Sequence, residues 1–560
     1  MNRAVIPIAV QGASRERKRQ APKGRRVDPV ALAEVQALLG ASERRRDLLI
    51  EHLHLIQDRY GCLSTAHLAA LAAEMRLSQA EVFEVASFYH HFDIVREGEE
   101  APAALTVRVC GGLSCELAGS RELLARLPAL LGREVRLLSA PCIGRCDQAP
   151  AALVAQQAIP HATPAAIAQS VSTMGSGTEV DTGSAVHDYR VLRACHGGER
   201  EVEAVIAEME HSGLRGLGGA GFPTGRKWRI VRNEPGPRLM AVNIDEGEPG
   251  TFKDRFYLER DPQRFIEGML IAAWAVGIDE IYIYLRDEYH DCRQLLAAEL
   301  KKLQADPPVP QLPKIHLRRG AGAYICGEES AMIESIEGKR GMPRLRPPYV
   351  AQVGLFGRPT LEHNFETLYW VRDILEKGAD WFASEGRNGR KGLRSFSVSG
   401  RVKEPGVKLA PAGITIRELI AEYCGGMLDG HELYAYLPGG ASGGILPAGM
   451  DDIPLDFDTL QPYGCFVGSA AIIVLSNHDT AAAAARNMMA FFRDESCGQC
   501  TPCRVGTAKA VDLLAQPVWD AGLLGELSQV MRDASICGLG QAAPNPVDCV
   551  LRYFPHEVGA

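Results

Sequence analysis

The chain has 560 residues, of which 46% are hydrophobic and 23% charged, a composition typical of a globular protein with several domains. Its formal charge of −8 is unevenly distributed, because residues 3–26 carry a net charge of +7 and the remainder therefore −15. A predominantly acidic body argues against nucleic-acid binding. Since no apolar run approaches the ~18 residues of a membrane span, we expect no membrane-spanning segment.

The basic head, residues 1–29, lacks the apolar segment of a secretory signal, and we expect the chain to be cytoplasmic. A flexible tail that pairs with an acidic surface is the simplest interpretation of this segment.

Fifteen cysteines are many for a chain without an export signal, and they gather at 110–115, 142–146 and 497–503. In a reducing compartment such clusters predict ligands of metals or redox cofactors rather than disulfides. Seven cysteines outside the clusters and their expected fourth ligand are predicted to be buried, inert thiols. These are Cys62, Cys195, Cys292, Cys326, Cys424, Cys465 and Cys549.

Residues 30–103 carry apolar side chains at helical spacing and predict a helical bundle. His52 and His54 lie two positions apart in one predicted helix, so they point to different faces, which argues against a metal ion shared by these two. His90 and His91, near the end of the bundle, are expected to have structural rather than metal-binding roles.

Residues 104–171 alternate strands, glycine-rich loops and a helix at 121–131, a pattern that predicts a small α/β domain. Two cysteine pairs lie in loops that follow its strands. Four thiolates suit either a [2Fe–2S] cluster or a zinc ion, and their spacing alone leaves both open. The pairs are Cys110 with Cys115 and Cys142 with Cys146.

Residues 172–189 are rich in Gly, Ser and Thr and predict a linker. The next unit, 190–394, alternates helices and strands and predicts an α/β domain, whereas 395–477 is rich in strands and turns and predicts a small β-containing domain.

A glycine loop at 216–221 satisfies G-x-G-x-x-G, the pattern of a Rossmann dinucleotide site. That site needs a strand before the glycines and a helix directly after them. Here a helical pattern precedes the loop at 202–209, and Pro223 and Gly225 argue against a regular helix that starts immediately after it. The Rossmann interpretation therefore fails, and we expect a tight loop whose backbone approaches a flat or phosphorylated ligand.

Four carboxylates in the same domain lie beside glycines, at Asp245, Glu246, Glu328 and Glu329. Acidic residues at strand ends are commonly solvated or cap helices. The alternative is that they form hydrogen bonds with ribityl, ribose or amide groups of a bound cofactor.

The last unit, 478–560, is helical in pattern and contains Cys497, Cys500 and Cys503 at regular spacing, followed by Cys537. Four thiolates suit a [4Fe–4S] cluster, and a zinc ion is the alternative. Three consecutive cysteines with a remote fourth favour the iron–sulfur cluster, which also tilts the N-terminal cysteine pairs towards iron.

Several motifs between about 200 and 555 together resemble the NADH-binding flavoprotein subunit of respiratory complex I. They are GLGGAGFPTGRKW (216–228), NIDEGEPGTFKDR (243–255), GAYICGEE (322–329), ESCGQCTPCR (495–504) and SICGLG (535–540). ASFYHHF (86–92) and the two N-terminal cysteine pairs resemble the small [2Fe–2S] subunit of the same complex.

The resemblance implies a multidomain α/β and α+β protein. A helical bundle and a thioredoxin-like [2Fe–2S] domain would precede a non-Rossmann domain for FMN and NAD(H). A β-grasp-like domain and a helical bundle with a [4Fe–4S] cluster would complete the chain. Flavin would exchange a hydride with NAD(H) and single electrons with the clusters, with no side-chain acid or base required.

The same resemblance implies particular contact residues. The residues that would hold FMN are Gly216, Gly218, Lys227, Asn243, Asp245, Gly327, Glu328 and Asn364. Those that would serve NAD(H) are Phe222, Glu246, Glu248, Glu329 and Tyr349. Two positions depart from the family pattern, because His363 stands where a second asparagine is usual and Tyr349 where phenylalanine is commoner.

Fusions of the two subunits resemble the diaphorase subunits of soluble NAD-dependent formate dehydrogenases and NAD-reducing hydrogenases. Segments 47–61 and 397–413 are most similar to the beta subunit of a formate dehydrogenase. Because the chain has no molybdopterin-type domain, formate oxidation would belong to a molybdenum- or tungsten-pterin alpha subunit with iron–sulfur clusters, in an oligomer of heterodimers. The alternatives are a hydrogenase diaphorase, a complex I flavoprotein and, as a non-enzyme, a zinc-stabilised binding module.

Overall fold

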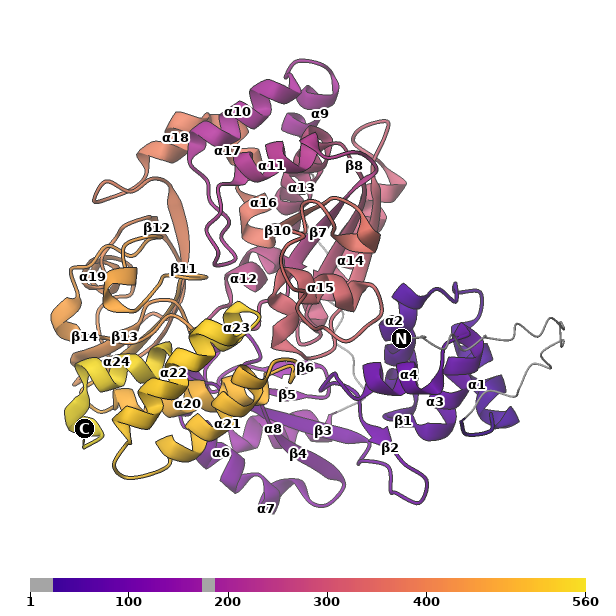
Figure 1. Cartoon of the computed structure of the whole chain (residues 1–560), viewed down its shortest axis with the longest axis horizontal. Coiled ribbons are helices and arrows are strands. Elements are labelled where there is room, and N and C mark those ends of the chain that lie inside the picture. The colour runs from indigo at the N-terminus through magenta and orange to yellow at the C-terminus, as the bar shows by residue number, and fades with distance from the viewer. Residues whose placement is uncertain (1–23, 174–186, 560) are drawn as a thin grey trace, which may run out of the picture.

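Figure 1 shows the computed structural model, which describes residues 24–173 and 187–559. Most of the predicted tail (1–29) and linker (172–189) lies outside these residues. Among the described residues, no helix combines the length and apolar character needed to cross a bilayer.

The predicted N-terminal helical bundle is present, and its helices begin at capping residues. Asp28 accepts hydrogen bonds from the backbone of the first helix, and Ser78 with Glu81 forms a capping box at the fourth. A short parallel pair of strands closes the bundle. The elements are α1 (Pro29–Leu39), η1 (Arg46–Leu48), α2 (Leu49–Tyr60), β1 (Leu63–Ser64), α3 (Thr65–Met75), α4 (Gln79–Ala86) and β2 (Ile94–Val95).

The second unit has a four-stranded sheet in the order β4-β3-β5-β6, with its own small apolar core. The helix predicted at 121–131 is in fact two helices, because the second begins at Pro128, which has no N–H to continue the first. The elements are β3 (Leu105–Cys110), α5 (Leu113–Leu117), α6 (Ser120–Arg126), α7 (Pro128–Leu131), β4 (Val135–Ala140), η2 (Cys146–Gln148), β5 (Ala152–Val154), β6 (Gln157–Ile159) and α8 (Pro164–Ser172).

The third unit is an α/β domain whose four strands are all parallel, in the order β10-β7-β8-β9. The strands are β7 (Arg238–Ile244), β8 (Ile278–Leu285), β9 (Lys314–Arg319) and β10 (Thr360–Asn364). The helices are α9 (Arg190–His196), α10 (Val202–Ser212), α11 (Thr224–Asn233), α12 (Lys253–Arg260), α13 (Pro262–Val276), α14 (His290–Ala305), η3 (Tyr324–Gly327), α15 (Glu329–Ile336), η4 (Leu355–Gly357), α16 (Phe365–Tyr369), α17 (Val371–Lys377) and α18 (Ala379–Ser384).

One expectation in this domain was wrong, since α11 begins at Thr224, directly after the glycine loop. Pro223 occupies the N-cap position, where a missing N–H costs nothing. Gly225 does not end the helix but lets it approach α10, because a Cβ there would lie 2.5 Å from the backbone nitrogen of Glu210. The segment before the loop is a helix, as predicted, so the Rossmann order of elements is absent here.

The fourth unit is a five-stranded sheet in the order β12-β11-β15-β13-β14, with the parallel pair β11 and β15 at its centre. Its elements are β11 (Leu393–Gly400), β12 (Gly406–Pro411), α19 (Ile416–Tyr423), β13 (Leu433–Leu437), β14 (Leu446–Pro447), η5 (Ala448–Met450), η6 (Gln461–Tyr463) and β15 (Ala471–Ser476).

The C-terminal helices pack between this sheet and the second unit (Figure 1). They are α20 (Ala481–Asp494), α21 (Thr501–Leu514), α22 (Ala521–Ala534), α23 (Gly538–Ala542), α24 (Asn545–Tyr553) and η7 (Pro555–Glu557). One apolar core runs through the N-terminal bundle, the α/β domain, the five-stranded sheet and these helices.

Candidate functional site

Polar residues meet where the two adjacent strands β7 and β10 end. Asn243 and Asn364 are paired in register at this edge. The Asn243 side chain donates to the carbonyl of Gly327 (2.8 Å) and accepts from the backbone N–H of Asp245 (3.0 Å). Four of the residues predicted to hold FMN therefore lie together.

The glycine loop closes over the same edge. Gly216 donates to the Phe222 carbonyl (2.8 Å), and Gly221 donates to the Gly216 carbonyl (3.1 Å), so the loop is fixed by its own backbone. A Cβ on Gly218 would lie 2.9 Å from the Asn364 Cβ. The loop can approach the strand ends only because residue 218 has no side chain.

Asp245 carries an unsatisfied atom at this edge. Its Oδ2 is buried and has no hydrogen-bond partner within the part of the chain that the structure describes. Burial raises the pKa of this carboxyl well above its usual range. A buried polar atom without a partner, beside a glycine cradle, fits a bound ligand that supplies the missing hydrogen bond.

Lys227 lies at the β10 side of the site and is paired within the protein. Its ammonium donates to the Glu362 carbonyl (2.8 Å) and to the Glu362 carboxylate (3.1 Å). Burial, together with repulsion from Glu362, raises the pKa of Glu329, and Lys227 acts in the opposite direction. Lys227, Glu362 and Glu329 thus form one charged group.

Glu328 serves as the N-cap of α15 and accepts from the backbone N–H groups of Ser330 (2.9 Å) and Ala331 (2.8 Å). Arg346 contacts both Glu328 and Glu329, the latter at 2.9 Å. The neighbouring carboxylates are thereby held at the start of one helix.

Among the residues predicted to serve NAD(H), Phe222 and Tyr349 are 38% and 57% exposed, so their rings lie on an open rim. Glu248 lies inside, where it accepts from the backbone N–H (2.8 Å) and hydroxyl (2.6 Å) of Ser442 and from the Tyr324 hydroxyl. Glu248 therefore ties the site to the five-stranded sheet.

Glu246, also predicted to serve NAD(H), is bonded within the protein. Its two oxygens accept from the backbone of Asp254 (2.8 Å) and Arg255 (3.1 Å) and from the Tyr289 hydroxyl (2.9 Å). Burial raises the pKa of Glu246 to about 7, with repulsion from Asp254 as the second cause. These bonds hold the start of α12, and a contact with NAD(H) stays a prediction.

His363 lies on the opposite face of β10 from Asn364, as strand alternation requires. It is 2% exposed and accepts a hydrogen bond from the Trp228 indole (2.9 Å). It is therefore a core residue, which agrees with its departure from the family pattern.

Sequence reasoning missed Lys253, which lies beneath the site and is 1% exposed. Its ammonium pairs with Asp254 (2.7 Å) and Glu366 (3.2 Å) and approaches the Asn364 amide oxygen (3.4 Å). Burial lowers its pKa, but the surrounding carboxylates outweigh this and raise it overall. The signal was present, because Lys253 lies in the 243–255 motif.

The four N-terminal cysteines converge. The Cys142 and Cys146 sulfurs are 3.3 Å apart, and Cys110 contacts both Cys115 and Cys142. All four are at most 5% exposed. Convergence of buried thiols from two loops fits the predicted cluster.

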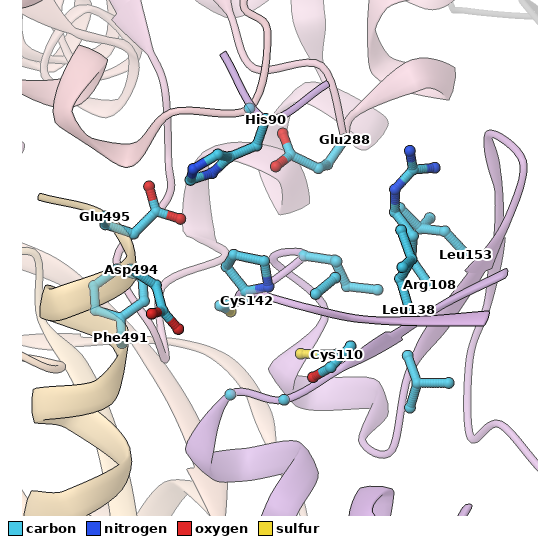
Figure 2. Close-up of a pocket in the computed structure, with 18 of the residues that line it drawn as sticks. His90, Arg108, Cys110, Leu138, Cys142, Leu153, Glu288, Phe491, Asp494 and Glu495 are labelled. Atoms are coloured by element: carbon cyan, nitrogen blue, oxygen red, sulfur yellow. The ribbon is translucent and has the colours of Figure 1, made fainter. Parts of the chain in front are cut away.

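A cavity of about 1050 Å³ borders these cysteines. Cys110 and Cys142 lie on one side of it, and Phe491 and Asp494 of α20 lie on another (Figure 2). Arg286 of the α/β domain donates to the Cys142 carbonyl (2.8 Å), which fixes the cysteine loop against that domain.

The C-terminal cysteines converge as well. Cys497, Cys500, Cys503 and Cys537 line one small pocket, and all but Cys503 are half-buried. Gly540 packs closely against them, since a Cβ there would lie 2.8 Å from the Cys503 Cβ.

The short helix η3 joins the three places. Tyr324 lines the cavity beside the N-terminal cysteines, Ile325 lines the pocket of the C-terminal cysteines, and Gly327 receives the hydrogen bond of Asn243. One turn of chain therefore contacts both cysteine sets and the glycine-loop site.

Known proteins share this arrangement of sites. Over 383 residues the chain is 39% identical to a NADH-quinone oxidoreductase subunit of Rhizobium meliloti (strain 1021), the second of its F type, a match that covers 66% of this chain and 91% of that protein. The chain belongs to the family of this oxidoreductase subunit. It is also 40% identical over 372 residues to the mitochondrial NADH dehydrogenase [ubiquinone] flavoprotein 1 of Dictyostelium discoideum, covering 63% of this chain and 78% of that protein.

A solved structure extends the similarity to the N-terminal part. A chain in the H2-reduced crystal structure of an NAD+-reducing [NiFe]-hydrogenase is 32% identical, with a TM-score of 0.81 and 92% coverage of both chains. This similarity therefore spans nearly the whole length of both chains.

Four sequence families match successive parts of the chain and confirm the predicted fold class and cofactors. The chain has a thioredoxin-like [2Fe–2S] domain, an FMN-binding domain, an SLBB domain and a C-terminal [4Fe–4S] region. The matches are Thioredoxin-like [2Fe-2S] ferredoxin (35–175), Nuo51 FMN-binding domain (209–373), SLBB domain (395–446) and NADH-ubiquinone oxidoreductase-F iron-sulfur binding region (483–560).

Proposed function

We propose that this chain is the diaphorase subunit of a cytoplasmic, multi-subunit NAD-dependent oxidoreductase. The observation that carries the proposal is the position of η3 (Tyr324–Gly327), which contacts the glycine-loop site and both cysteine sets. FMN supplies the exchange between a hydride of NAD(H) and single electrons of iron–sulfur clusters. The chain's own task is to bring these three sites within one short segment.

Within this proposal the backbone of the glycine loop and the polar groups of Asn243, Asp245, Gly327 and Asn364 hold the flavin. The geometry supports this, because Asp245 Oδ2 needs a partner and Gly218 leaves room at the strand ends. Lys227, Gly216 and Glu328 complete this set in the proposal.

NAD(H) would enter at the rim formed by Phe222 and Tyr349, whose exposed rings suit stacking on adenine. Glu329 lies beside this rim through Arg346, and Glu248 closes the inner side. No side chain acts as an acid or base, so positioning is the contribution of these residues.

Gly218→Val tests the flavin site. The added side chain would collide with Asn364, so we expect flavin content to fall at least tenfold while the N-terminal domain keeps its cluster. Flavin released by acid precipitation and the electron paramagnetic resonance signal of the reduced [2Fe–2S] cluster give the two readouts. Stoichiometric flavin in a folded variant would overturn the assignment.

The electron exit in this proposal is the C-terminal cysteine set, because three of its four members are half-buried whereas the N-terminal set is enclosed. Ligation of the [4Fe–4S] cluster by Cys497, Cys500, Cys503 and Cys537, and of the [2Fe–2S] cluster by Cys110, Cys115, Cys142 and Cys146, is part of it.

For the partner we propose a molybdenum- or tungsten-pterin formate dehydrogenase alpha subunit, in an oligomer of heterodimers. The support is the similarity of segments 47–61 and 397–413 to formate dehydrogenase beta subunits. A hydrogenase partner is the second candidate, favoured by the 92% two-way coverage of the [NiFe]-hydrogenase chain. Purification of the native complex decides between them, since formate-dependent NAD+ reduction with bound molybdenum or tungsten supports the first and hydrogen-dependent reduction with nickel supports the second.

A further inference from the structure

Three side chains of the N-terminal bundle converge at its contact with the α/β domain. His54 and Asp58 lie four residues apart on α2, and therefore on one helix face, and His91 follows α4. One ligand atom from each of the three lies within 4.8 Å of the others. This group is separate from both cysteine sets and from the glycine-loop site.

The hydrogen bonds of the two histidines fix which nitrogen remains available. His54 Nε2 donates to the Gly320 carbonyl (2.9 Å), and His91 Nδ1 donates to the Asp287 carboxylate (2.6 Å). His54 Nδ1 and His91 Nε2 are consequently left over, and both are buried without a partner among the described residues. Metal-binding histidines show the same arrangement, with the second ring nitrogen held by a carbonyl or carboxylate.

An unpartnered imidazole nitrogen alone does not indicate a metal. His52 Nδ1 and His67 Nδ1 are also buried without partners, but within the described ranges neither belongs to a set of three converging His, Cys, Asp or Glu ligand atoms. The distinguishing feature of His54 and His91 is that their free nitrogens converge and that a carboxylate lies beside them.

Asp58 is shared with Arg319, which also contacts Asp287. One Asp58 oxygen is 2.5 Å from the guanidinium and the other is 3.3 Å away, so the second oxygen is the more available ligand. The Asp58 side chain is 39% exposed, which leaves it room to turn between the two roles.

We propose that His54 Nδ1, His91 Nε2 and Asp58 bind one divalent transition-metal ion of the zinc class. Two imidazoles and a carboxylate form a ligand set that zinc accepts, and its bonds of about 2.0–2.2 Å require ligand atoms about 3.3 Å apart. Small side-chain rotations close the present separations. His91 and Asp58 also line the 1050 Å³ cavity, so water has access to a fourth position.

The ion would fasten the N-terminal bundle to the α/β domain. Its ligands come from the bundle, whereas the groups that orient the two histidines, Gly320 and Asp287, belong to the α/β domain. An ion that binds only the folded arrangement stabilises it by mass action. The site is thus a clip at the junction rather than a part of the electron route.

The test uses the full chain with its flavin and clusters. Protein is mixed with equimolar Zn²⁺ and desalted, and zinc, iron and flavin are measured on the same sample by mass spectrometry and absorbance. We expect about one zinc per flavin in the unmodified chain and at least a tenfold lower ratio in Asp58→Asn and His54→Gln. The matched control is His52→Gln, a buried histidine of the same helix, which should retain the zinc.

Asp58→Asn keeps the proposal falsifiable if His54→Gln does not fold, because residue 58 is partly exposed. Zinc should also raise the melting temperature of the unmodified chain and not that of Asp58→Asn. Equal zinc in the unmodified chain and Asp58→Asn, no zinc in either, or zinc gained only as iron is lost from the clusters would each overturn the proposal.

Discussion

The two cysteine sets lie in different surroundings. The N-terminal set is enclosed, with each cysteine at most 5% exposed and its loop held by hydrogen bonds from Arg286 to Cys142 and from Arg255 to Gly144. The C-terminal set lies at the starts of α21 and α23, and three of its members are half-buried. The contrast indicates an interior centre and one that a partner can approach.

Charge differs between the sets in the same way. Arg286 and Arg255 are buried beside the N-terminal loop, whereas the carboxylate of Glu328 is a charged neighbour of Cys497 and Cys537. Positive charge stabilises a reduced cluster, which is the more negative form, and negative charge opposes reduction. These charges therefore favour reduction of the enclosed centre and oppose reduction of the open one.

The largest effect is expected for Cys500→Ala. Loss of a proposed ligand should remove about four iron atoms per chain and abolish electron transfer to the partner. NADH-dependent reduction of ferricyanide, which takes electrons from the flavin, should remain. Transfer to the partner at the normal rate would show that the C-terminal set is not the exit.

Cys115→Ala is the counterpart in the enclosed set. It should remove about two iron atoms per chain and leave most transfer to the partner intact, because the proposed route does not leave through this centre. Iron content and partner-linked turnover are measured side by side. A loss of turnover as large as that in Cys500→Ala would place both centres on one route and contradict the proposed contrast.

A smaller effect is expected from two glycines of one motif. A Cβ on Gly540 would lie 2.5 Å from the Ser535 hydroxyl, whereas none of the described atoms lies within 4 Å of a Cβ on Gly538. Gly540→Ala should cost about 1–3 kcal/mol and weaken retention of the C-terminal cluster, while Gly538→Ala should not. Thermal unfolding and iron retention in the pair of variants check this, and equal behaviour would mean that close packing does not shape the site.

The smallest effect is expected for Arg286→Gln. Removal of a buried positive charge beside Cys142 should lower the reduction potential of the N-terminal cluster by tens of millivolts, on the order expected for a neighbouring charge, and leave that of the C-terminal cluster unchanged. Arg121→Gln, at a 74% exposed side chain of the same domain as the cluster, is the control. A redox titration followed by electron paramagnetic resonance separates the two clusters, and an equal shift in both would contradict a local effect of charge.

Local patterns in the sequence were enough for most elements and for the cysteine sets. Helical and strand periodicity identified the α/β domain, and the helix before the glycines excluded a Rossmann site. Convergence of Cys110 with Cys142 follows from strand ends that lie at one edge of a sheet, since β3 and β4 are paired in parallel.

What the sequence did not predict depends on contacts between distant segments. The start of α11 was missed because Gly225 serves close packing against Glu210 rather than a helix end. Glu246 was assigned to the nucleotide because its motif does not reveal that α12 takes up both oxygens. The pairing of His54 with His91 arises only when two segments of the bundle fold together.

The most direct test of the account is an anaerobic NADH titration of the purified full chain, followed by visible absorption. The account predicts one flavin with about six iron atoms per chain, and NADH should bleach both the flavin band near ~450 nm and the broader iron–sulfur absorbance. Bleaching of both requires that the rim, the glycine-loop site and the clusters are connected. A chain that contains zinc in place of iron and no flavin, or a spectrum that NADH leaves unchanged, would contradict it.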